Sequence, residues 1–493
     1  MRFQPVSAPR TGPAAVRLSA GVLTPVQEAF VTSAQPWAAA WGAPGTGKTT
    51  AVIAKALYEI EAGNTALVLT RNRLAADAVH NALSEELGDL TPARTAHTVS
   101  SLAFALLSYE AKNGLLGAVT AAPKMVTGAE TDALIGQIIQ HFSSPGRPTS
   151  AAERAPGESG GSSAQQPVTY TPASPASAAF ESALREARLP AEVMQLSQFR
   201  SELRDALMRA EEAGRSWEEI SALSTEYGIA AWQLIAQVLK QYEEVLALAA
   251  GTEDQSERLD VSAMVYAAAA RIPQWPGAAS HLPDCLIIDD VQEITAAGWG
   301  LLDSLSSCGV RIALVGNPDQ AVETFRGAAG REMADFDDPL VFDVDFTHDP
   351  AITGLLTRLA EHIGAFGAIV HRHPDAEREA GNDAVAAHLV TSSAREQYHA
   401  VNLVRSWVLT GRAEHALAED APHEASATAT GAHLEYRDIA IITRSSSLAA
   451  GMANALQDAD IPVVTTQTGV LLKAEPAVIP LLKAARISIS REA

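Results

Sequence analysis

One short glycine-rich loop constrains the fold of this chain more than any other stretch. Residues 42–49 read Gly-Ala-Pro-Gly-Thr-Gly-Lys-Thr and match the phosphate-binding pattern G-x-x-x-x-G-K-[ST]. Glycines let the backbone curl so that successive N–H groups point inward at phosphate oxygens, and the following helix adds its positive end. An apolar stretch, residues 37–41, precedes the loop, and a helical one, residues 50–60, follows it. The sequence therefore predicts a strand, a phosphate-binding loop and a helix.

The residue types of this loop are suited to a nucleoside triphosphate that carries Mg²⁺. We expect Lys48 to reach the β- and γ-phosphates and to take part in catalysis, and we expect the Thr49 hydroxyl to hold the metal ion. The residues expected to surround the phosphates are Gly42, Ala43, Pro44, Gly45, Thr46, Gly47, Lys48, Thr49 and Thr50.

Two carboxylates follow a second apolar run. Residues 286–288 are apolar, and Asp289 and Asp290 come directly after them. In a protein with a phosphate-binding loop, a carboxylate at such a place holds Mg²⁺, usually through water. We expect Asp289 to be the metal partner and Asp290 to orient or activate the attacking water. The alternative is that the strand simply meets a capped turn.

Polar residues also follow the next apolar run, residues 312–316. Gln320 lies just beyond it, and a glutamine beside a nucleotide can contact the γ-phosphate and report hydrolysis to the rest of the chain. Phe325 and Arg326 come shortly afterwards. An aromatic ring next to an arginine can stack on a nucleic-acid base, although Phe325 can equally belong to the core.

Alternating strands and helices predict an α/β fold with a parallel sheet. Residues 21–110 and 284–335 should form an ATP-binding domain. Residues 111–283 read as helices with no clear strand and should be an insertion in that domain, in which residues 143–177 are rich in Ser, Pro, Ala and Gly and are expected to be disordered. Residues 1–20 read as a flexible N-terminus.

A second, smaller α/β region is expected over residues 340–493, with a loose loop at 416–431. Its expected strands are residues 341–344, 385–390, 439–443 and 462–465. Its expected helices are residues 350–363, 394–409, 447–459 and 476–486.

Composition bears on location and partners. The two cysteines, Cys285 and Cys308, make neither a disulfide framework nor a metal site, so a reducing cytoplasm is expected. The sequence has neither a secretory signal pattern nor about 18 consecutive apolar residues, so no membrane partner is expected. The net charge of -22 argues against general coating of nucleic acid but leaves room for a narrow basic groove.

In order and spacing, these motifs resemble those of the UvrD/Rep-type superfamily 1 DNA helicases. Residues 23–27 are similar to the Q motif of that family, and residues 42–50 are similar to its motif I. Further similar segments are residues 70–76 (motif Ia), 95–98 (Ib), 289–293 (II), 316–320 with 325–328 (III), 438–445 (a strand signature of the second RecA-like domain) and 471–482.

This resemblance implies a P-loop NTPase with a RecA-like sheet, a helical insertion subdomain and an incomplete second RecA-like domain. It implies that Gln27 reads the adenine of ATP. It implies an enzyme, an ATP-dependent DNA helicase, which couples hydrolysis of ATP with Mg²⁺ to movement on single-stranded or duplex-end DNA in repair or recombination. The residues that would contact DNA are Thr70, Asn72, Thr95, His97, Phe325 and Arg326.

Within the family, residues 203–210 and the alanine-rich composition resemble actinobacterial AdnA-type (RecB-like) motor subunits, which implies a helicase or nuclease partner subunit. Three departures favour an alternative, a nucleotide-binding scaffold subunit that hydrolyses ATP poorly. Asp290 stands where the family usually has glutamate. Residues 345–348 (Asp-Phe-Thr-His) replace a segment whose arginine touches the γ-phosphate. The sequence ends at Ala493, before motifs V and VI, which implies an N-terminal portion.

Overall fold

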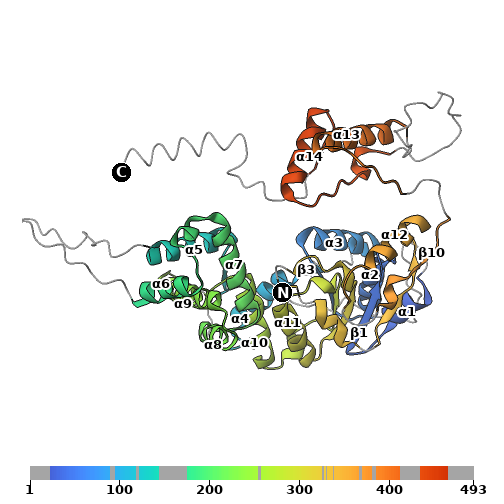
Figure 1. The fold of residues 1–493 in the computed structure, drawn as a ribbon. Coiled ribbons are helices and arrows are strands. Elements are labelled where there is room, and N and C mark those ends of the chain that lie inside the picture. The colour runs from blue at the N-terminus through green and yellow to red at the C-terminus, as the bar shows by residue number, and fades with distance from the viewer. Residues whose placement is uncertain are drawn as a thin grey trace, which may run out of the picture. The chain divides into compact units, whose positions relative to one another are not determined.

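The fold is described from a computed structural model that covers most of the chain (Figure 1). The described residues are 23–88, 95–117, 121–143, 175–253, 257–324, 327–328, 330–336, 338–365, 369–379, 385–410 and 434–464. They fall in two compact units, Met1–Glu379 and Ala380–Ala493. The expectations for residues 1–20, 416–431 and 471–482, and for the helix at 476–486, lie outside the described residues. Of the segment 143–177, which was expected to be disordered, residues 144–174 also lie outside them, but residue 143 ends a helix and residues 175–177 begin one, so the expectation was wrong there.

A six-stranded parallel sheet forms the centre of the first unit, with strand order β3-β2-β6-β7-β1-β8. Its strands are β1 (Trp37–Gly42), β2 (Ala66–Thr70), β3 (Ala96–Thr98), β6 (Cys285–Ile288), β7 (Arg311–Gly316) and β8 (Leu340–Phe342). Neighbours in the sheet are not always neighbours in the sequence, since parallel strands need crossover connections. The predicted α/β fold with a parallel sheet is confirmed.

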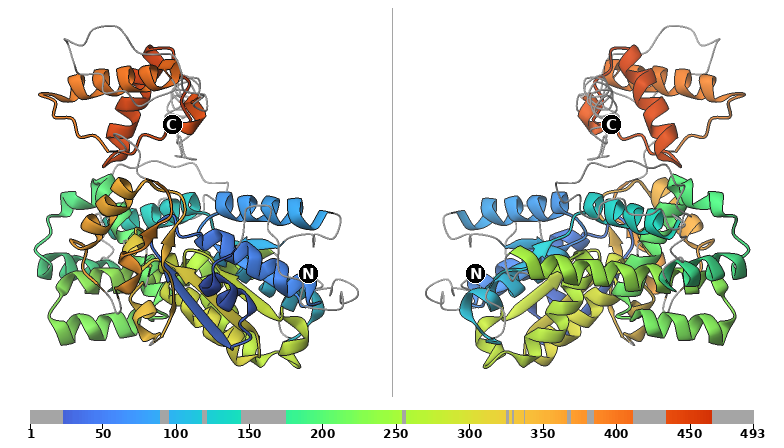
Figure 2. Two further views of the ribbon diagram at one scale, coloured as in Figure 1. Left: turned by 90° about the vertical axis from the view of Figure 1, so that its right-hand side faces the viewer. Right: turned by 90° about the vertical axis from the view of Figure 1, so that its left-hand side faces the viewer.

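The two faces of the sheet carry separate hydrophobic cores. Figure 2 shows helices on both sides of the sheet. Leu286 and Ile288 of β6 share one core with α4 (Val99–Asn113), α10 (Val261–Arg271) and α11 (Ala296–Ser307). Cys285 and Ile287 face the other core, which contains residues of α1 (Pro25–Thr32), α2 (Lys48–Glu61) and α3 (Arg73–Leu87). Burial on both faces explains why β6 is apolar without alternation.

The starts of two helices follow from local side-chain caps. Thr24 accepts a hydrogen bond from the Gln27 backbone N–H (3.2 Å), and the Gln27 side chain accepts one from the Thr24 N–H (2.9 Å). This capping box, with Pro25 in the first turn, starts α1. The Asn72 side chain caps the start of α3, and Gly88 follows its last residue.

The helical insertion has a core of its own. The helices α5 (Gly128–Ser143), α6 (Pro175–Glu186), α7 (Ser197–Glu212), α8 (Trp217–Tyr227) and α9 (Ala230–Glu253) pack around buried side chains such as Phe180 and Tyr242. One correction concerns strands, because β4 (Lys124–Met125) pairs in parallel with β5 (Arg258–Leu259) where the chain enters and leaves the helices. Strands of two residues are too short to produce a periodic apolar signal, so the sequence did not predict them.

Acidic side chains lie where α7 meets α10. The Ser262 hydroxyl donates to a Glu212 carboxylate oxygen (3.1 Å), and burial raises the pKa of Glu212 to about 7. Burial, with a hydrogen bond to Asp260 and the negative charge there, raises the pKa of Glu211 to about 10. The junction between the helical insertion and the sheet therefore holds carboxyl groups that favour their protonated form.

We predict that Glu211→Gln stabilises the first unit at pH 8 and has little effect at pH 5. A carboxyl whose pKa is higher in the folded than in the unfolded chain stabilises the fold fully below pH 4.5, and this contribution is lost as the pH rises toward 10. Glutamine is neutral throughout and avoids that loss. The measurement is the thermal unfolding midpoint at both pH values, with the exposed Glu226→Gln as control. Equal shifts at both pH values would contradict the prediction.

The first unit extends further along the chain than the sequence predicts. β8 pairs with β1 through Ala40 and Leu340, so it joins the first sheet. β9 (Val344–Asp345) pairs with β10 (Asp375–Ala376), and α12 (Pro350–Ala360) lies between them in the sequence. Residues 340–379, which the sequence placed in the second region, therefore belong to the first compact unit. A short apolar run predicts a strand but does not say which sheet it joins.

The second unit contains α13 (Ser393–Thr410) and α14 (Ser446–Asp458), with a small core that includes Val404 and Leu456. The strands expected at 385–390 and 439–443 are not formed, and the described residues 462–464 form none either. The backbone at Ile439 is extended, but a strand also needs a hydrogen-bonded neighbour. The identification of this unit as a second RecA-like domain stays a prediction.

In the part of the chain that the structure describes, no helix combines the length and the apolar character needed to cross a membrane.

Candidate active site

Neighbouring strands bring the predicted site residues together at one edge of the sheet. β1 leads into the phosphate-binding loop, β6 ends just before Asp289, and β7 ends just before Asn317. These strands are adjacent, in the order β6-β7-β1, and all are parallel. Because the carboxyl ends of parallel strands meet at one edge, this edge is where a nucleotide would bind.

Lys48 begins α2 and lies folded back onto the loop. Its ammonium group donates hydrogen bonds to the carbonyl oxygens of Gly42 (3.0 Å) and Ala43 (2.8 Å). Burial lowers the pKa of Lys48, while the negative charges of Asp290, Asp289 and, less strongly, Asp345 raise it. A buried cation with only carbonyl partners is suited to receive an anion such as a phosphate.

Thr49 and Asp289 form the predicted metal-binding pair. The Thr49 hydroxyl donates to the Asp289 carboxylate over 2.8 Å, and Asp289 is buried. Burial, followed by the charge of Asp290, raises the pKa of Asp289 to about 6. A hydroxyl and a carboxylate are oxygen ligands of the kind that Mg²⁺ prefers, so the pair fits this ion. Among the described residues, no group of three or more His, Cys, Asp and Glu is arranged so that it could hold a metal ion.

Asp290 adopts a backbone conformation that is uncommon for residues other than glycine, with φ of 56° and ψ of 46°. One of its carboxylate oxygens accepts a hydrogen bond from the Gln292 side chain (3.1 Å). The other lies 3.6 Å from Nε of Arg71. The left-handed conformation turns the chain sharply after β6, and strain of this kind concentrates at functional sites.

Gln292 is a site residue that sequence reasoning missed. Its side chain is buried, and its amide nitrogen donates to Asp290 while its amide oxygen accepts from the Asn317 backbone N–H (3.0 Å). It therefore joins the end of β6 to the end of β7. The only sequence signal is a polar residue within the motif, and its role depends on a contact 25 residues further along the chain.

Gln27 lies against the phosphate-binding loop, as the resemblance implies. Its side chain is buried, and its amide nitrogen donates to the Thr46 carbonyl (3.1 Å). A β-carbon placed on Gly47 would lie 2.7 Å from this nitrogen and 3.8 Å from the Phe346 ring. Gln27 and Phe346 thus both reach the same glycine, and the role of Gln27 in reading adenine stays a prediction.

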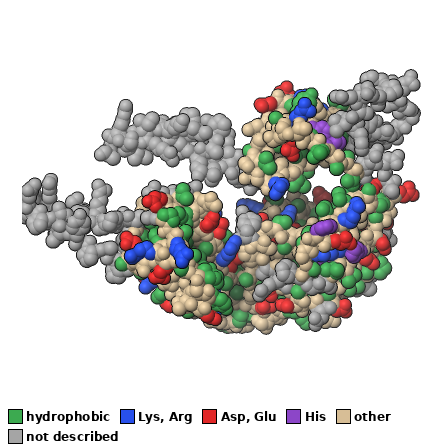
Figure 3. Space-filling model, in the orientation of Figure 1, with side chains coloured by type: hydrophobic (Ala, Val, Ile, Leu, Met, Phe, Trp, Pro, Cys, Tyr) green, Lys and Arg blue, Asp and Glu red, His purple; other side chains and the backbone are tan. Residues whose placement is uncertain are grey.

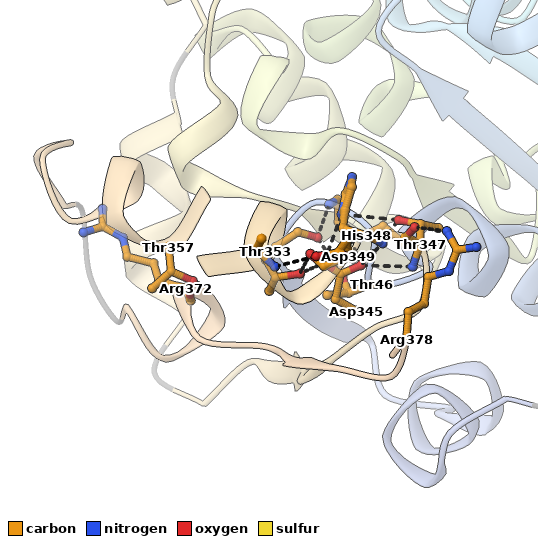
Figure 4. A network of polar contacts seen from close by, with 12 residues as sticks. Thr46, Asp345, Thr347, His348, Asp349, Thr353, Thr357, Arg372 and Arg378 are labelled. Carbon is orange, nitrogen blue, oxygen red and sulfur yellow. Dashed lines mark hydrogen bonds and ion pairs between the residues drawn. The ribbon is translucent and has the colours of Figure 1, made fainter. Parts of the chain in front are cut away.

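The segment 345–348 lies directly on the loop, which sequence reasoning did not reveal. The Phe346 N–H donates to the Gly45 carbonyl (3.1 Å). A β-carbon on Gly45 would lie 2.1 Å from an Asp345 carboxylate oxygen and 2.6 Å from both Thr347 Oγ1 and His348 Nδ1. Figure 4 shows Asp345, Thr347 and His348 gathered beside Thr46 of the loop.

Asp345 organises this segment. Its carboxylate has no exposed surface and accepts hydrogen bonds from the Thr353 hydroxyl (2.8 Å) and the backbone N–H groups of Thr347 and His348 (3.1 Å each). His348 Nδ1 lies 3.0 Å from the same group. Burial opposes the ionised form, but these hydrogen bonds outweigh it and lower the pKa of Asp345. The carboxylate is therefore a fixed negative charge beside the loop.

Gln320 is exposed, at the end of a short helical turn after β7. Its neighbour Asp319 is held by the Arg372 guanidinium (2.9 Å from Nε) and by His371 Nε2 (3.0 Å). The turn that carries Gln320 is thus tied to residues beyond β8, while its contact with a γ-phosphate stays a prediction. Phe325 and Arg326 lie outside the described residues.

Four of the six side chains predicted to contact DNA lie between the end of β2 and the start of α4. Thr70, Thr95 and His97 are buried, and only Asn72 lies at the surface, where it caps α3. Thr70 Oγ1 donates to the Asn72 carbonyl (3.0 Å), and Thr95 Oγ1 lies 3.0 Å from Nδ1 of His80. These side chains support the edge of the sheet in this structure, and DNA contact by them stays a prediction.

We predict that Gly45→Ala weakens nucleotide binding at least about tenfold, since the methyl group collides with Asp345 and the residue has a φ of 83°. Gly63→Ala is the matched control, because Gly63 has a φ of 87° but no neighbour within 4 Å of the added carbon. The measurement is titration with a fluorescent ATP analogue. Equal losses of affinity in the two variants would contradict the prediction.

A strand, a phosphate-binding loop with Lys48, and acids at the end of a neighbouring parallel strand define a P-loop NTPase with a RecA-like sheet. The family model for the UvrD/REP helicase N-terminal domain matches residues 23–340, more than half of the chain, and the chain belongs to this family. Helicases of this type in general use ATP with Mg²⁺ and act on DNA. A comparison with curated proteins gives no significant match.

Proposed function

We propose that this chain is a motor that couples ATP hydrolysis to translocation on single-stranded DNA, or to unwinding, in DNA repair or recombination. The observation that carries the proposal is the convergence of Lys48, Thr49, Asp289 and Asp290 at the carboxyl edge of the sheet. The family match supports the general activity.

Nucleotide binding begins with the loop. The phosphates take the place of the carbonyl partners of Lys48, so its ammonium group turns from Gly42 and Ala43 toward an anion. Thr49 and Asp289 hold Mg²⁺, which neutralises charge on the phosphates. Gln27 is already held beside the loop by Thr46 and is placed to bind the base.

Hydrolysis needs a group that positions water, and Asp290 takes that role. It follows the metal-binding acid and is fixed by Gln292, whose other end reaches β7. Gln320, two residues beyond Pro318 in the turn after β7, contacts the γ-phosphate and reports its loss. Gln320 and Asp319 lie in the same turn, and Asp319 accepts a hydrogen bond from Arg372. Loss of the phosphate at Gln320 is therefore transmitted to the residues after β8.

DNA binds along the same edge of the sheet. β2 and β3 are the next strands after β6. Thr70 ends β2 and Asn72 follows it at the edge that holds the acids, whereas His97 lies within β3 and Thr95 just before it. Phe325 and Arg326 add stacking and a positive charge. On the face drawn in Figure 3, Lys and Arg are interspersed with Asp and Glu over the helical insertion, so DNA contacts should be few and local.

A specific observation favours a second candidate, a subunit that binds nucleotide but hydrolyses it poorly. The segment that touches Gly45 has Thr347 at the place of the family's arginine and brings a buried carboxylate, Asp345, to the loop. An absent arginine of this kind is worth about 10³–10⁵ in rate. Such a chain would act in the cytoplasm with a helicase or nuclease partner, as the AdnA-type resemblance implies. Its second unit would serve as a partial RecA-like domain.

We predict that Lys48→Ala lowers single-strand-stimulated ATP hydrolysis about a hundredfold or more, because the variant lacks the buried cation at the phosphates. Lys112→Ala, which removes an exposed lysine at the end of α4, should leave the rate unchanged. The measurement is phosphate release with and without an oligothymidylate.

The two candidates give different results in that assay. Turnover that rises with DNA and disappears in Lys48→Ala supports the motor. Nucleotide binding without turnover, in the purified chain and with a partner subunit added, supports the scaffold. Unchanged stimulated turnover in Lys48→Ala would rule out both.

A further inference from the structure

An arginine at the end of β2 contacts the acid that is placed to activate water. Arg71 lies between Thr70 and Asn72, the residues proposed to contact DNA. Its Nε atom lies 3.6 Å from a carboxylate oxygen of Asp290. The Arg71 side chain is 51% exposed and that of Asp290 is 25% exposed. One ion pair thus joins the proposed DNA edge to the nucleotide site.

We propose that Arg71 is a switch that couples DNA binding to ATP hydrolysis. Without DNA, its guanidinium group stays on Asp290 and holds the acid away from water. When a strand binds, the guanidinium turns to a backbone phosphate and releases Asp290. The inference deepens the proposed motor function and rests on it, because it names how the same site is regulated.

The contacts with Gln292 and Arg71 engage both carboxylate oxygens with which Asp290 would hold the attacking water. Gln292 donates to one oxygen, and Arg71 faces the other. A carboxylate with a protein group at each oxygen has fewer lone pairs left with which to hold an attacking water. The charges of Lys48 and Asp289 also lie near Asp290, but Lys48 is held by the Gly42 carbonyl and Asp289 by the Thr49 hydroxyl. Of these three charged neighbours of Asp290, Arg71 is the one at the surface.

The pair is weak enough to exchange. An exposed ion pair contributes little, because water screens it and long side chains lose freedom. At 3.6 Å the Arg71 contact is longer than a good hydrogen bond, whereas the Gln292 contact measures 3.1 Å and is half-buried. A phosphate offers a guanidinium group two parallel hydrogen bonds and a full negative charge. A DNA strand at β2 can therefore compete for Arg71 while Gln292 keeps Asp290 in place.

A double-mutant cycle of DNA binding tests the switch without ATP. The proteins are the full chain, Arg71→Ala, Asp290→Asn and the double variant, each titrated with a labelled oligothymidylate. Asp290→Asn frees Arg71 and should raise DNA affinity about two- to fivefold, the range that an exposed pair allows. The increase should be lost when Arg71 is absent. Asparagine tolerates the left-handed backbone at position 290, so the variant should fold.

Arg73 provides the matched control, because it is an exposed arginine at the start of α3, two residues beyond Arg71. Asp290→Asn should raise DNA affinity as much in the Arg73→Ala background as in the full chain. If Asp290→Asn raises affinity equally with and without Arg71, the effect is general charge removal and the switch is overturned.

Phosphate release separates the inference from the function on which it rests. Arg71→Ala should raise turnover without DNA and shrink the stimulation by DNA, whereas Arg73→Ala should preserve the stimulation. DNA-stimulated turnover that keeps its ratio in Arg71→Ala overturns the switch and leaves the motor intact. A chain with no Lys48-dependent turnover overturns the motor, and the binding cycle then decides whether Arg71 and Asp290 are coupled.

Discussion

The buried pairing of β6 between β2 and β7 is the constraint on which the site depends. All residues of this strand are buried, and the chain leaves the core at the two aspartates. β6 is reached only after the long helical insertion, so the ends of that insertion must be held together. The Trp275 indole N–H donates to the buried Glu110 carboxylate (2.8 Å), and α10 and α4 share the core under β6. The acids are thus positioned by contacts far from them in the sequence.

The charges of the cleft explain why a metal–nucleotide complex suits it better than a bare nucleotide. The negative charges of Asp289, Asp290 and Asp345 all act on Lys48. Three carboxylates against the Lys48 ammonium and the half-exposed Arg71 guanidinium leave the cleft short of positive charge, and a bare triphosphate would add to the imbalance. Mg²⁺ would reduce it, and the Thr49 and Asp289 oxygens lie together where such an ion would be held.

The sequence predicted what depends on local spacing. The loop at residues 42–49 and the acid after β6 could be found because strand–loop–helix patterns and parallel strands have fixed geometry. The contacts of Arg71 with Asp290 and of Asp345 with Gly45 could not, since they join residues hundreds of positions apart and carry no periodic signal. The membership of β8 in the first sheet was missed for the same reason. Apolar character shows that a strand is buried, not which neighbour it has.

Two departures from the family pattern act in the same direction. Asp290 is one methylene shorter than glutamate, and its left-handed backbone directs it toward Gln292 and Arg71. The segment 345–348 has Thr347 where the family has the arginine that touches the γ-phosphate, and it brings the buried Asp345 carboxylate to Gly45. In the proposed function both departures would lower the rate of a cleft acting alone, while neither removes the groups that bind nucleotide. The motor and the scaffold therefore share one binding site and differ in whether a cation reaches the reacting phosphate.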